Sequence, residues 1–227
     1  MIDAHCHIRR AATRHLLCAP FTDAPTDADV VFYGLHPWTF NRTDISEASL
    51  EAALACVRAA VCANPRAGVG EIGLDRLKAR EIPSRARAAF EAQLRLAADE
   101  GRRVVLHGAK CWGEVARAAE IHRARIPAFL FHGFSRSGGL LPDIVRMNGF
   151  IGVGMSLLND HALNYRALVK ALPLERILLE SDATEETRAK YPPLETLARC
   201  LAEVRNMPLD ELVEQLETNV ERFLGAG

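Results

Sequence analysis

The sequence lacks several features that would place the chain in a specialised class. Its 227 residues carry a formal net charge of −1 when the eight histidines are counted as neutral. A global basic field of the kind that drives non-specific nucleic-acid binding is therefore absent. The sequence contains no apolar run long enough to span a bilayer and no internal repeat. Charge and hydropathy together give no reason to expect a membrane partner.

Paired cysteines are also absent. The six cysteines are scattered without a C-x-x-C pair (Cys6, Cys18, Cys56, Cys62, Cys111 and Cys200). The N-terminus has no cationic segment followed by an apolar stretch, as a secretory signal would have. We therefore expect reduced thiols and a cytoplasmic location.

The N-terminal region has little sequence between its predicted strands. Residues 1–7, 15–19 and 30–36 are short apolar, partly β-branched runs, which favour strands. The two segments between them are too short for a crossover helix of normal length. Only 26 residues, 8 to 33, separate His7 from Gly34. We therefore expect no helix after the first and second strands.

From residue 46 onward, helical and strand patterns alternate regularly. Periodicity predicts helices over 46–63, 84–100, 114–124, 140–147, 162–172, 194–206 and 209–224, and strands over 103–107, 128–132, 150–154 and 176–180, with a further strand within 68–75 that ends at Glu71. Alternation of this kind indicates a parallel sheet, and eight strands in this length favour a TIM-like (β/α)₈ barrel. We expect one α/β domain that covers residues 1–227.

Ionisable residues stand at the ends of the predicted strands. They are His5, His7, His36, Glu71, His107, His132 and Asp182. In a parallel barrel these strand ends meet on one face, where such barrels carry their chemistry. Burying several such groups without a partner would cost several kcal/mol each, and a bound cation offsets that cost. The pattern therefore favours a metal site over a set of isolated core histidines.

The residue types narrow the choice of metal. With His36 set aside, four imidazoles and two carboxylates without a thiolate suit Zn²⁺, Mn²⁺ or Fe²⁺, and Mg²⁺ less well. Six ligands are too many for one open catalytic ion, so two divalent metals that share a carboxylate are expected. Two-metal sites of this type characteristically activate water for attack on a phosphoryl group.

Motifs in chain order carry a family resemblance. They are Met-Ile-Asp-Ala-His5-Cys-His7, Gly34-Leu-His36-Pro-Trp, Gly70-Glu71-Ile-Gly-Leu-Asp75, Val105-Leu-His107, Phe131-His132-Gly-Phe-Ser135-Arg-Ser137, Leu178-Leu-Glu180-Ser-Asp182 and Asn219-Val-Glu-Arg-Phe223. Together they resemble the TatD-type metal-dependent hydrolases, many of which are deoxyribonucleases. The resemblance covers nearly the whole chain, and Gly-Glu-Ile-Gly-Leu-Asp is its most specific piece.

The resemblance implies a role for each of these positions. His5, His7, Glu71 and Asp182 would surround one metal, and Glu71 would bridge to a second metal held by His107 and His132. Glu71 and Asp182 would be the catalytic carboxylates, with Asp182 orienting or deprotonating the attacking water. The implied activity is that of a phosphodiesterase or deoxyribonuclease that uses a metal-activated water.

Substrate contacts are expected on the loops that follow the strands. The resemblance places His36 near the substrate phosphate. Lys110 and Arg136 follow His107 and His132, and they either bind substrate phosphates or form ordinary solvated surface. The expected substrate is a nucleic acid or a small phosphoester. The loops after His107 and Asp182 depart from the family pattern, so the hydrolase chemistry is better supported than the DNase specificity.

Two other functions stay open at this point. An amidohydrolase-like barrel acting on a cyclic amide or lactone uses a similar His-x-His strand, although it often recruits a carboxylated lysine where this chain has Glu71. A non-catalytic metal-binding scaffold on the same barrel would explain the missing helices and altered loops. We expect a monomer or a weak homodimer. The dimer would bury Trp38 and Phe40 if the outer faces of the first strands are bare.

Overall fold

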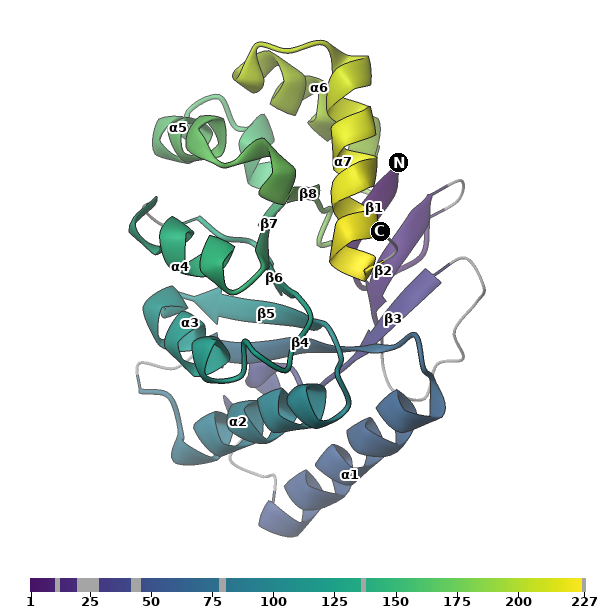
Figure 1. The fold of residues 1–227 in the computed structure, drawn as a ribbon, viewed down its shortest axis with the longest axis vertical. Helices are drawn as coiled ribbons and strands as arrows, with labels where there is room; N and C mark the ends of the chain where they lie inside the picture. The colour runs from purple at the N-terminus through teal and green to yellow at the C-terminus, as the bar shows by residue number, and fades with distance from the viewer. Residues whose placement is uncertain (11–12, 20–28, 42–45, 78–80, 136–137, 226–227) are drawn as a thin grey trace.

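The computed structural model describes residues 1–10, 13–19, 29–41, 46–77, 81–135 and 138–225. Eight strands form one parallel sheet in which each strand pairs with its neighbours in sequence. They are β1 (Ile2–Cys6), β2 (Arg14–Cys18), β3 (Asp29–Tyr33), β4 (Gly68–Asp75), β5 (Val104–Ala109), β6 (Phe129–Phe131), β7 (Gly149–Val153) and β8 (Ile177–Leu179). The sheet curls into a nearly closed, TIM-like (β/α)₈ barrel, as the alternation of strands and helices predicts (Figure 1).

The barrel closes between its first and last strands just beyond the end of β8. The backbone N–H of Asp182 donates to the carbonyl of His5 at 3.0 Å, and the N–H of His7 donates to the carbonyl of Ala183 at 2.8 Å. The two short bonds bring the end of β8 against β1. This closure fixes Asp182 beside the two histidines of β1.

The C-terminal helix α7 (Leu209–Leu224) covers the part of the barrel where the two edge strands, β1 and β8, do not pair. Asn219 is fully buried, and its Nδ2 donates to the carbonyls of Leu174 and Ile177, each at 2.8 Å. The ring of Phe223 packs against Phe32 and Phe150. Figure 1 shows this helix running alongside β1. The C-terminal motif of the sequence therefore seals the side of the barrel that the strands leave open.

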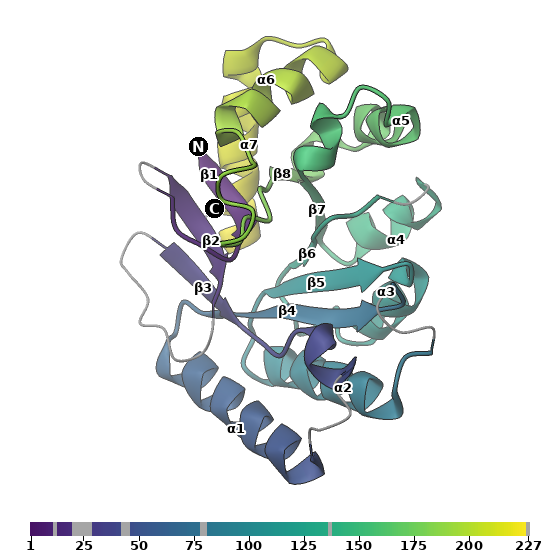
Figure 2. The same cartoon turned by 180° about the vertical axis from the view of Figure 1, so that it is seen from behind.

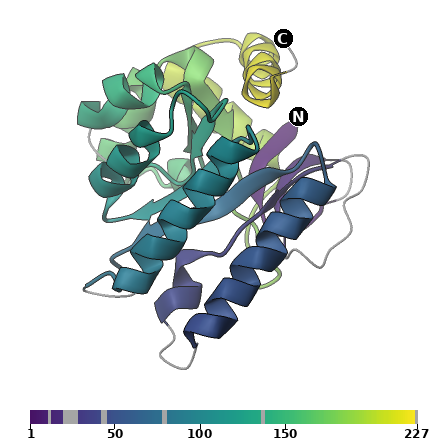
Figure 3. The same cartoon turned by 60° about the horizontal axis from the view of Figure 1, so that its bottom comes forward.

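The remaining helices cover the outside of the sheet (Figures 1 and 2). They are α1 (Glu47–Ala63), α2 (Ser84–Asp99), α3 (Trp112–Ile121), α4 (Leu141–Arg146), α5 (Leu163–Ala171) and α6 (Leu194–Arg205), with short 3₁₀ turns η1 (Pro37–Asn41), η2 (Gly138–Leu140), η3 (Met155–Leu158) and η4 (Leu174–Arg176). Helices α1 and α2 lie side by side (Figure 3). Among the residues described between β1 and β2, and between β2 and β3, none is helical. No helix in the described ranges is both long and apolar enough to cross a membrane.

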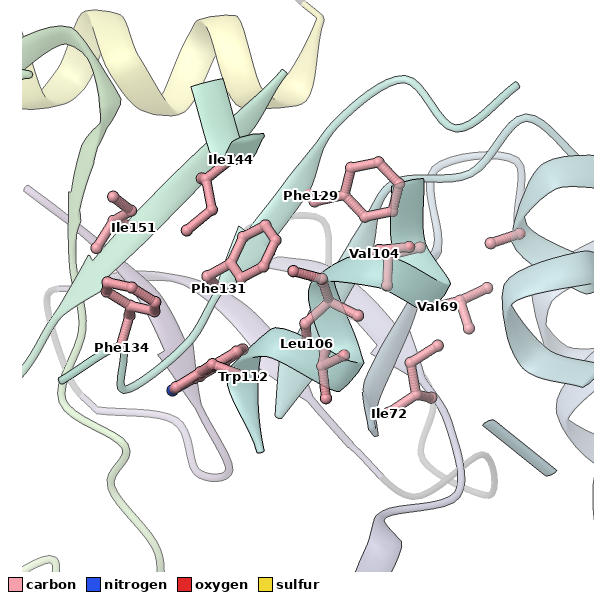
Figure 4. Close-up of a cluster of buried hydrophobic side chains, with 14 of the residues drawn as sticks. Val69, Ile72, Val104, Leu106, Trp112, Phe129, Phe131, Phe134, Ile144 and Ile151 are labelled. Atoms are coloured by element: carbon pink, nitrogen blue, oxygen red, sulfur yellow. The ribbon is translucent and has the colours of Figure 1, made fainter. Parts of the chain in front are cut away.

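The core has two layers because side chains alternate across each strand. Val104 and Leu106 of β5 point outward, where Figure 4 shows them with Phe129, Phe131 and Trp112 beneath the helices. Val105, between them, belongs to a second buried cluster with Leu130 and Leu178. His107, His132 and Glu180 each follow a member of this second cluster by two residues, so they continue the same inward face.

The structure corrects one premise of the sequence reasoning. The side chains of Leu17, Val31 and Tyr33 on β2 and β3 are almost fully buried, so the bare patch expected there is absent from the described part of these strands. Phe40 is also buried at 2% exposure and is unavailable to a partner, whereas Trp38 is 49% exposed. The oligomeric state itself stays a prediction.

Candidate active site

The predicted ligands converge at the carboxyl ends of the strands. His5 lies on β1, Glu71 on β4 and His107 on β5, while His132 directly follows β6. His7 follows β1 by one residue. Asp182 follows β8 in a left-handed backbone conformation (φ 51°), which Asp tolerates better than most residues and which turns its side chain at the strand end. Five strands therefore supply side chains to one site.

Glu71 lies at the centre, and its two oxygens face different histidines. Oε2 lies 3.4 Å from Nε2 of His5 and 3.4 Å from Nε2 of His7. Oε1 lies 2.5 Å from Nδ1 of His107 and 3.6 Å from Nε2 of His132. The side chain is only 4% exposed. One buried carboxylate thus lies between two histidine pairs and turns one oxygen toward each pair.

Asp182 approaches both pairs from the solvent side. Its Oδ1 lies 3.5 Å from Nε2 of His5 and of His7, and its Oδ2 lies 3.9 Å from Nε2 of His132. Its side chain is 49% exposed, in contrast to that of Glu71. Asp182 can therefore contact a cation and an incoming water or substrate at once.

The other ring nitrogens of three histidines have acceptors of their own. His107 Nε2 lies 3.0 Å from Asp75 Oδ2, and His132 Nδ1 lies 3.1 Å from Glu180 Oε1. His5 Nδ1 lies 3.5 Å from the sulfur of Cys18. A proton held on each of these nitrogens leaves the nitrogen that faces Glu71 with a lone pair. Outer partners of this type usually orient metal-ligating histidines.

His36 differs from this group. Its Nδ1 accepts a hydrogen bond from the backbone N–H of Trp38 at 3.2 Å. The neutral ring must then carry its proton on Nε2, which lies 3.5 Å from Glu71 Oε1. His36 is therefore arranged to donate a hydrogen bond into the site rather than a lone pair to a metal.

Neighbouring charges of opposite sign shift the pKa values of the residues in the site. Burial raises the pKa of Glu71, but His132 and His5 outweigh it and hold the pKa well below its ordinary value. Burial lowers the pKa of His7, but Asp182 and Glu71 outweigh it and raise the pKa above its ordinary value. Burial also lowers the pKa of His107, but Glu71 and Asp75 outweigh it and raise that pKa as well. In the absence of a metal, protons on the imidazoles balance the carboxylates. A divalent cation can replace those protons.

The residues fit a metal centre on two observations. His5 Nε2 is buried and has no hydrogen-bond partner among the described residues, which is costly unless a cation completes it. Two overlapping groups each place their ligand atoms within 4.8 Å of one another: His5, His7 and Glu71; and His5, His132 and Asp182. A third group, His36, Glu71 and His107, is equally close, but its His36 offers an N–H rather than a lone pair. Imidazole nitrogens and carboxylate oxygens suit divalent transition metals.

Gly73 explains why the Gly-Glu-Ile-Gly-Leu-Asp motif needs its second glycine. The residue has φ 152°, and a Cβ at this position would lie 1.9 Å from the carbonyl oxygen of His107. Any side chain would push β4 and β5 apart. The glycine therefore keeps Glu71 and His107 within contact distance.

Two cavities adjoin the predicted ligands. The first, of about 350 Å³, is lined by Leu77, His107, Gly108, Ala109, Lys110, Trp112, His132, Gly133 and Ser135. The second, of about 370 Å³, is lined by His132, Gly133, Ser135, Gly154, Met155, Ser156, Tyr165, Glu180, Ser181, Asp182 and Tyr191. Lys110 thus lies where a substrate contact is expected. Arg136, the other predicted cationic contact, lies outside the described residues.

The sequence analysis assigned no role to Glu180 or Cys18. The signal for Glu180 is its spacing, because it precedes Asp182 by two residues and so points to the same side of the strand. The signal for Asp3, two residues before His5, is the same. Asp3 is buried and accepts hydrogen bonds from Ser181 at 2.9 Å (N–H) and 2.6 Å (Oγ–H), which tie the two edge strands together. Cys18 lies on β2, and no sequence signal linked it to His5.

Comparison with known proteins identifies the family. The sequence profile of the TatD-related DNases matches residues 22–225. The chain belongs to the TatD-related DNase family. It is 29% identical to the uncharacterized metal-dependent hydrolase YjjV of Escherichia coli (strain K12), over 96% of this chain and 95% of that protein. The crystal structure of YjjV, a TatD homologue, superposes with a TM-score of 0.81 at 25% identity and covers 98% of this chain and 96% of that one.

A second relative bears a more specific name. The chain is 34% identical to the 3′-5′ ssDNA/RNA exonuclease TatD of Edwardsiella piscicida over 116 residues, which are 51% of this chain and 45% of that protein. The match therefore spans about half the length of that exonuclease.

Proposed function

We propose that this protein is a divalent-metal-dependent phosphodiesterase that removes nucleotides from single-stranded nucleic acid, using two metal ions. The observation that carries the proposal is the position of Glu71, whose two oxygens face the His5/His7 pair and the His107/His132 pair separately. The name of the exonuclease relative supports the substrate class.

The assignment of ligands follows from the directions of the ring nitrogens. His5, His7, Glu71 and Asp182 would hold one ion, and Glu71, His107 and His132 would hold the other. Two divalent ions at this position supply Lewis acidity to a phosphoryl group and favour ionisation of a water. Zn²⁺, Mn²⁺, Fe²⁺ and Mg²⁺ are the candidate ions, and nitrogen-rich ligands favour the first three.

The chain's own residues position the reacting groups and accept the proton of the attacking water. Asp182 stays ionised because burial, which raises its pKa, is outweighed by the neighbouring imidazoles of His5, His7 and His132, which lower it. Its half-exposed carboxylate accepts the proton of the attacking water. His36 donates its Nε2–H to a phosphoryl oxygen, and Lys110 binds the next phosphate along the strand.

A substrate panel tests the proposal. Protein loaded in turn with each candidate metal is assayed on single-stranded DNA, single-stranded RNA, bis-p-nitrophenyl phosphate and a cyclic amide. We expect chelator-sensitive cleavage of the phosphodiesters with about two metals bound per chain. Hydrolysis of the cyclic amide alone would favour the amidohydrolase function. Metal binding without turnover of any substrate would favour the scaffold.

A further inference from the structure

Two cavities meet at the loop that follows β6. The lysine cavity contains Lys110, and the tyrosine cavity contains Tyr165 and Tyr191. Both are lined by His132, Gly133 and Ser135. A substrate bound at the predicted metal site can therefore extend into one cavity on each side of the scissile bond.

The two cavities differ in charge. Among the described residues that line the lysine cavity, Lys110 is the one Lys or Arg and none is Asp or Glu. The described lining of the tyrosine cavity includes Glu180 and Asp182 and has no Lys or Arg. Asp182 faces the predicted ligands, so its charge is directed at the metals. Glu180 faces the outer nitrogen of His132, and no Lys or Arg in the described lining of this cavity offsets its charge.

Glu180 is placed and buried in an unusual way. Its side chain is 2% exposed, and Oε1 accepts hydrogen bonds from the backbone N–H of Gly133 at 2.7 Å and from His132 Nδ1 at 3.1 Å. Oε2 is buried and has no hydrogen-bond partner in the described part of the chain. A Cβ on residue 152 would lie 1.9 Å from this oxygen, so Gly152 is what admits the carboxylate. Oε1 is the oxygen on the cavity side, because a Cβ on Gly154, which lines the cavity, would lie 3.5 Å from it. A carboxylate at this wall favours a ligand that brings a hydrogen-bond donor over one that brings a second anion.

We propose that the tyrosine cavity binds the terminal nucleoside of the strand through its free sugar hydroxyl, and that Glu180 excludes a phosphate at that hydroxyl. The proposal rests on the phosphodiesterase function and names the end group that this function requires. A volume of about 370 Å³ lies at the small end of ligand sites and suits one nucleoside. Tyr191 offers a ring for base stacking.

The charge contrast then sets the direction of the strand. The chain continues with its phosphates toward Lys110, where a cation binds them. It cannot continue past Glu180, because a second phosphate there would meet a carboxylate with no Lys or Arg beside it in the described lining of the cavity. Lys110 and Glu180 together make the enzyme specific for the free end of a strand.

A binding experiment tests this without requiring turnover. Metal-loaded protein is titrated with thymidine 5′-monophosphate and with thymidine 3′,5′-bisphosphate, and the ratio of the two Kd values is compared between wild type and Glu180→Gln. We expect the monophosphate to bind about tenfold more tightly, although the bisphosphate carries more charge for the metals. Glu180→Gln should bring the ratio close to one. If Glu180→Gln acted only by weakening the hydrogen bond to His132, it would change the affinity for both nucleotides equally and leave the ratio of the two Kd values unchanged.

Two further variants complete the test. Tyr191→Ala should weaken binding of the monophosphate about tenfold and leave binding of inorganic phosphate unchanged, because only the nucleoside stacks. Glu186→Gln, an exposed carboxylate on the same loop, should keep the wild-type ratio. Equal affinities in wild type, a ratio that survives Glu180→Gln, or no nucleotide binding would overturn the inference. Nucleotide binding with the expected preference but no cleavage of any oligonucleotide would instead contradict the phosphodiesterase function.

Discussion

His107 Nε2 lies 3.0 Å from Asp75 Oδ2, and this contact leaves Nδ1 of the same ring facing Glu71. Asp75 is buried and also accepts hydrogen bonds from the indole N–H of Trp38 at 2.7 Å and from the backbone N–H of Leu77 at 2.6 Å. The carboxylate is thus held by several donors while it fixes the ring of a predicted metal ligand. The last residue of the Gly-Glu-Ile-Gly-Leu-Asp motif therefore sets which nitrogen of His107 faces Glu71.

Replacing Asp75 should weaken the binding of one metal ion more than the binding of the other. Without its acceptor, His107 can rotate or change tautomer, and loss of an outer partner typically costs about 10–100-fold in metal affinity. Asp75→Ala should therefore retain about one tightly bound ion in a competition with chelator where wild type retains two. Asp143→Ala, a surface carboxylate paired with Arg146, is the matched control. Unchanged affinity for both ions in Asp75→Ala would refute this role.

The metal-free protein should lose stability as the pH rises above neutrality. The pKa values of His7 and His107 in the folded protein lie above their ordinary 6.5, so their contribution is complete below pH 6.5 and is lost as the pH rises through the raised values. The pKa of Glu71 lies below its ordinary 4.5, so its contribution is present above pH 4.5 and is lost in acid. We expect the highest Tm of the metal-free protein between these two values.

Bound metal should remove the loss of stability above pH 6.5, because deprotonated imidazoles bind the metal ions in place of protons. Thermal unfolding with chelator and with excess metal, from about pH 4 to about pH 8, measures both effects. A Tm of the metal-free protein that climbs steadily through this range would show that the histidines are not protonated in the folded state.

Asn219→Leu should destabilise the barrel without altering the predicted ligands. The substitution keeps the branched heavy-atom shape of the side chain but leaves the buried carbonyls of Leu174 and Ile177 without the Asn219 donor. At about 1–3 kcal/mol for each of the two unsatisfied groups, the loss should be roughly 2–6 kcal/mol. Denaturant unfolding measures it. Thr218→Ala, exposed on the same helix, should change stability by less than about 0.5 kcal/mol.

How much of this could be predicted from sequence depends on the range of each interaction. The ligands were predictable because most of them stand at or just after the end of a strand whose pattern is local, and parallel strands bring their ends together. The prediction that the fourth strand ends at Glu71 was wrong, because β4 continues to Asp75 and Glu71 lies within it. The side chains that orient those ligands were harder to predict from the sequence. Cys18 meets His5 only through the pairing of β1 with β2, and the buried position of Phe40 depends on its surroundings in the folded chain. The charge difference between the cavities required residues from separate loops.

Lys110 should contribute to binding of the strand and not to the chemical step. Lys110→Ala is expected to raise KM for a single-stranded oligonucleotide, with kcat nearly unchanged. It should also reduce the slope of log affinity against log salt by about 0.7, the value for one phosphate contact on a single strand. Lys170→Ala, which lines neither cavity, should keep the wild-type slope. An unaltered slope in Lys110→Ala would place the lysine in ordinary solvated surface.

The most direct test of the proposed chemistry is the rate of cleavage of a single-stranded oligonucleotide by Asp182→Asn. The amide keeps the shape of the side chain but cannot accept the proton of the attacking water. The account predicts a loss of kcat of about 10²–10⁴-fold, with the fold and the binding of nucleoside monophosphate retained. Glu186→Asn, four residues along the same loop, should cleave like wild type. Chelator-sensitive cleavage by Asp182→Asn at the wild-type rate would contradict the account.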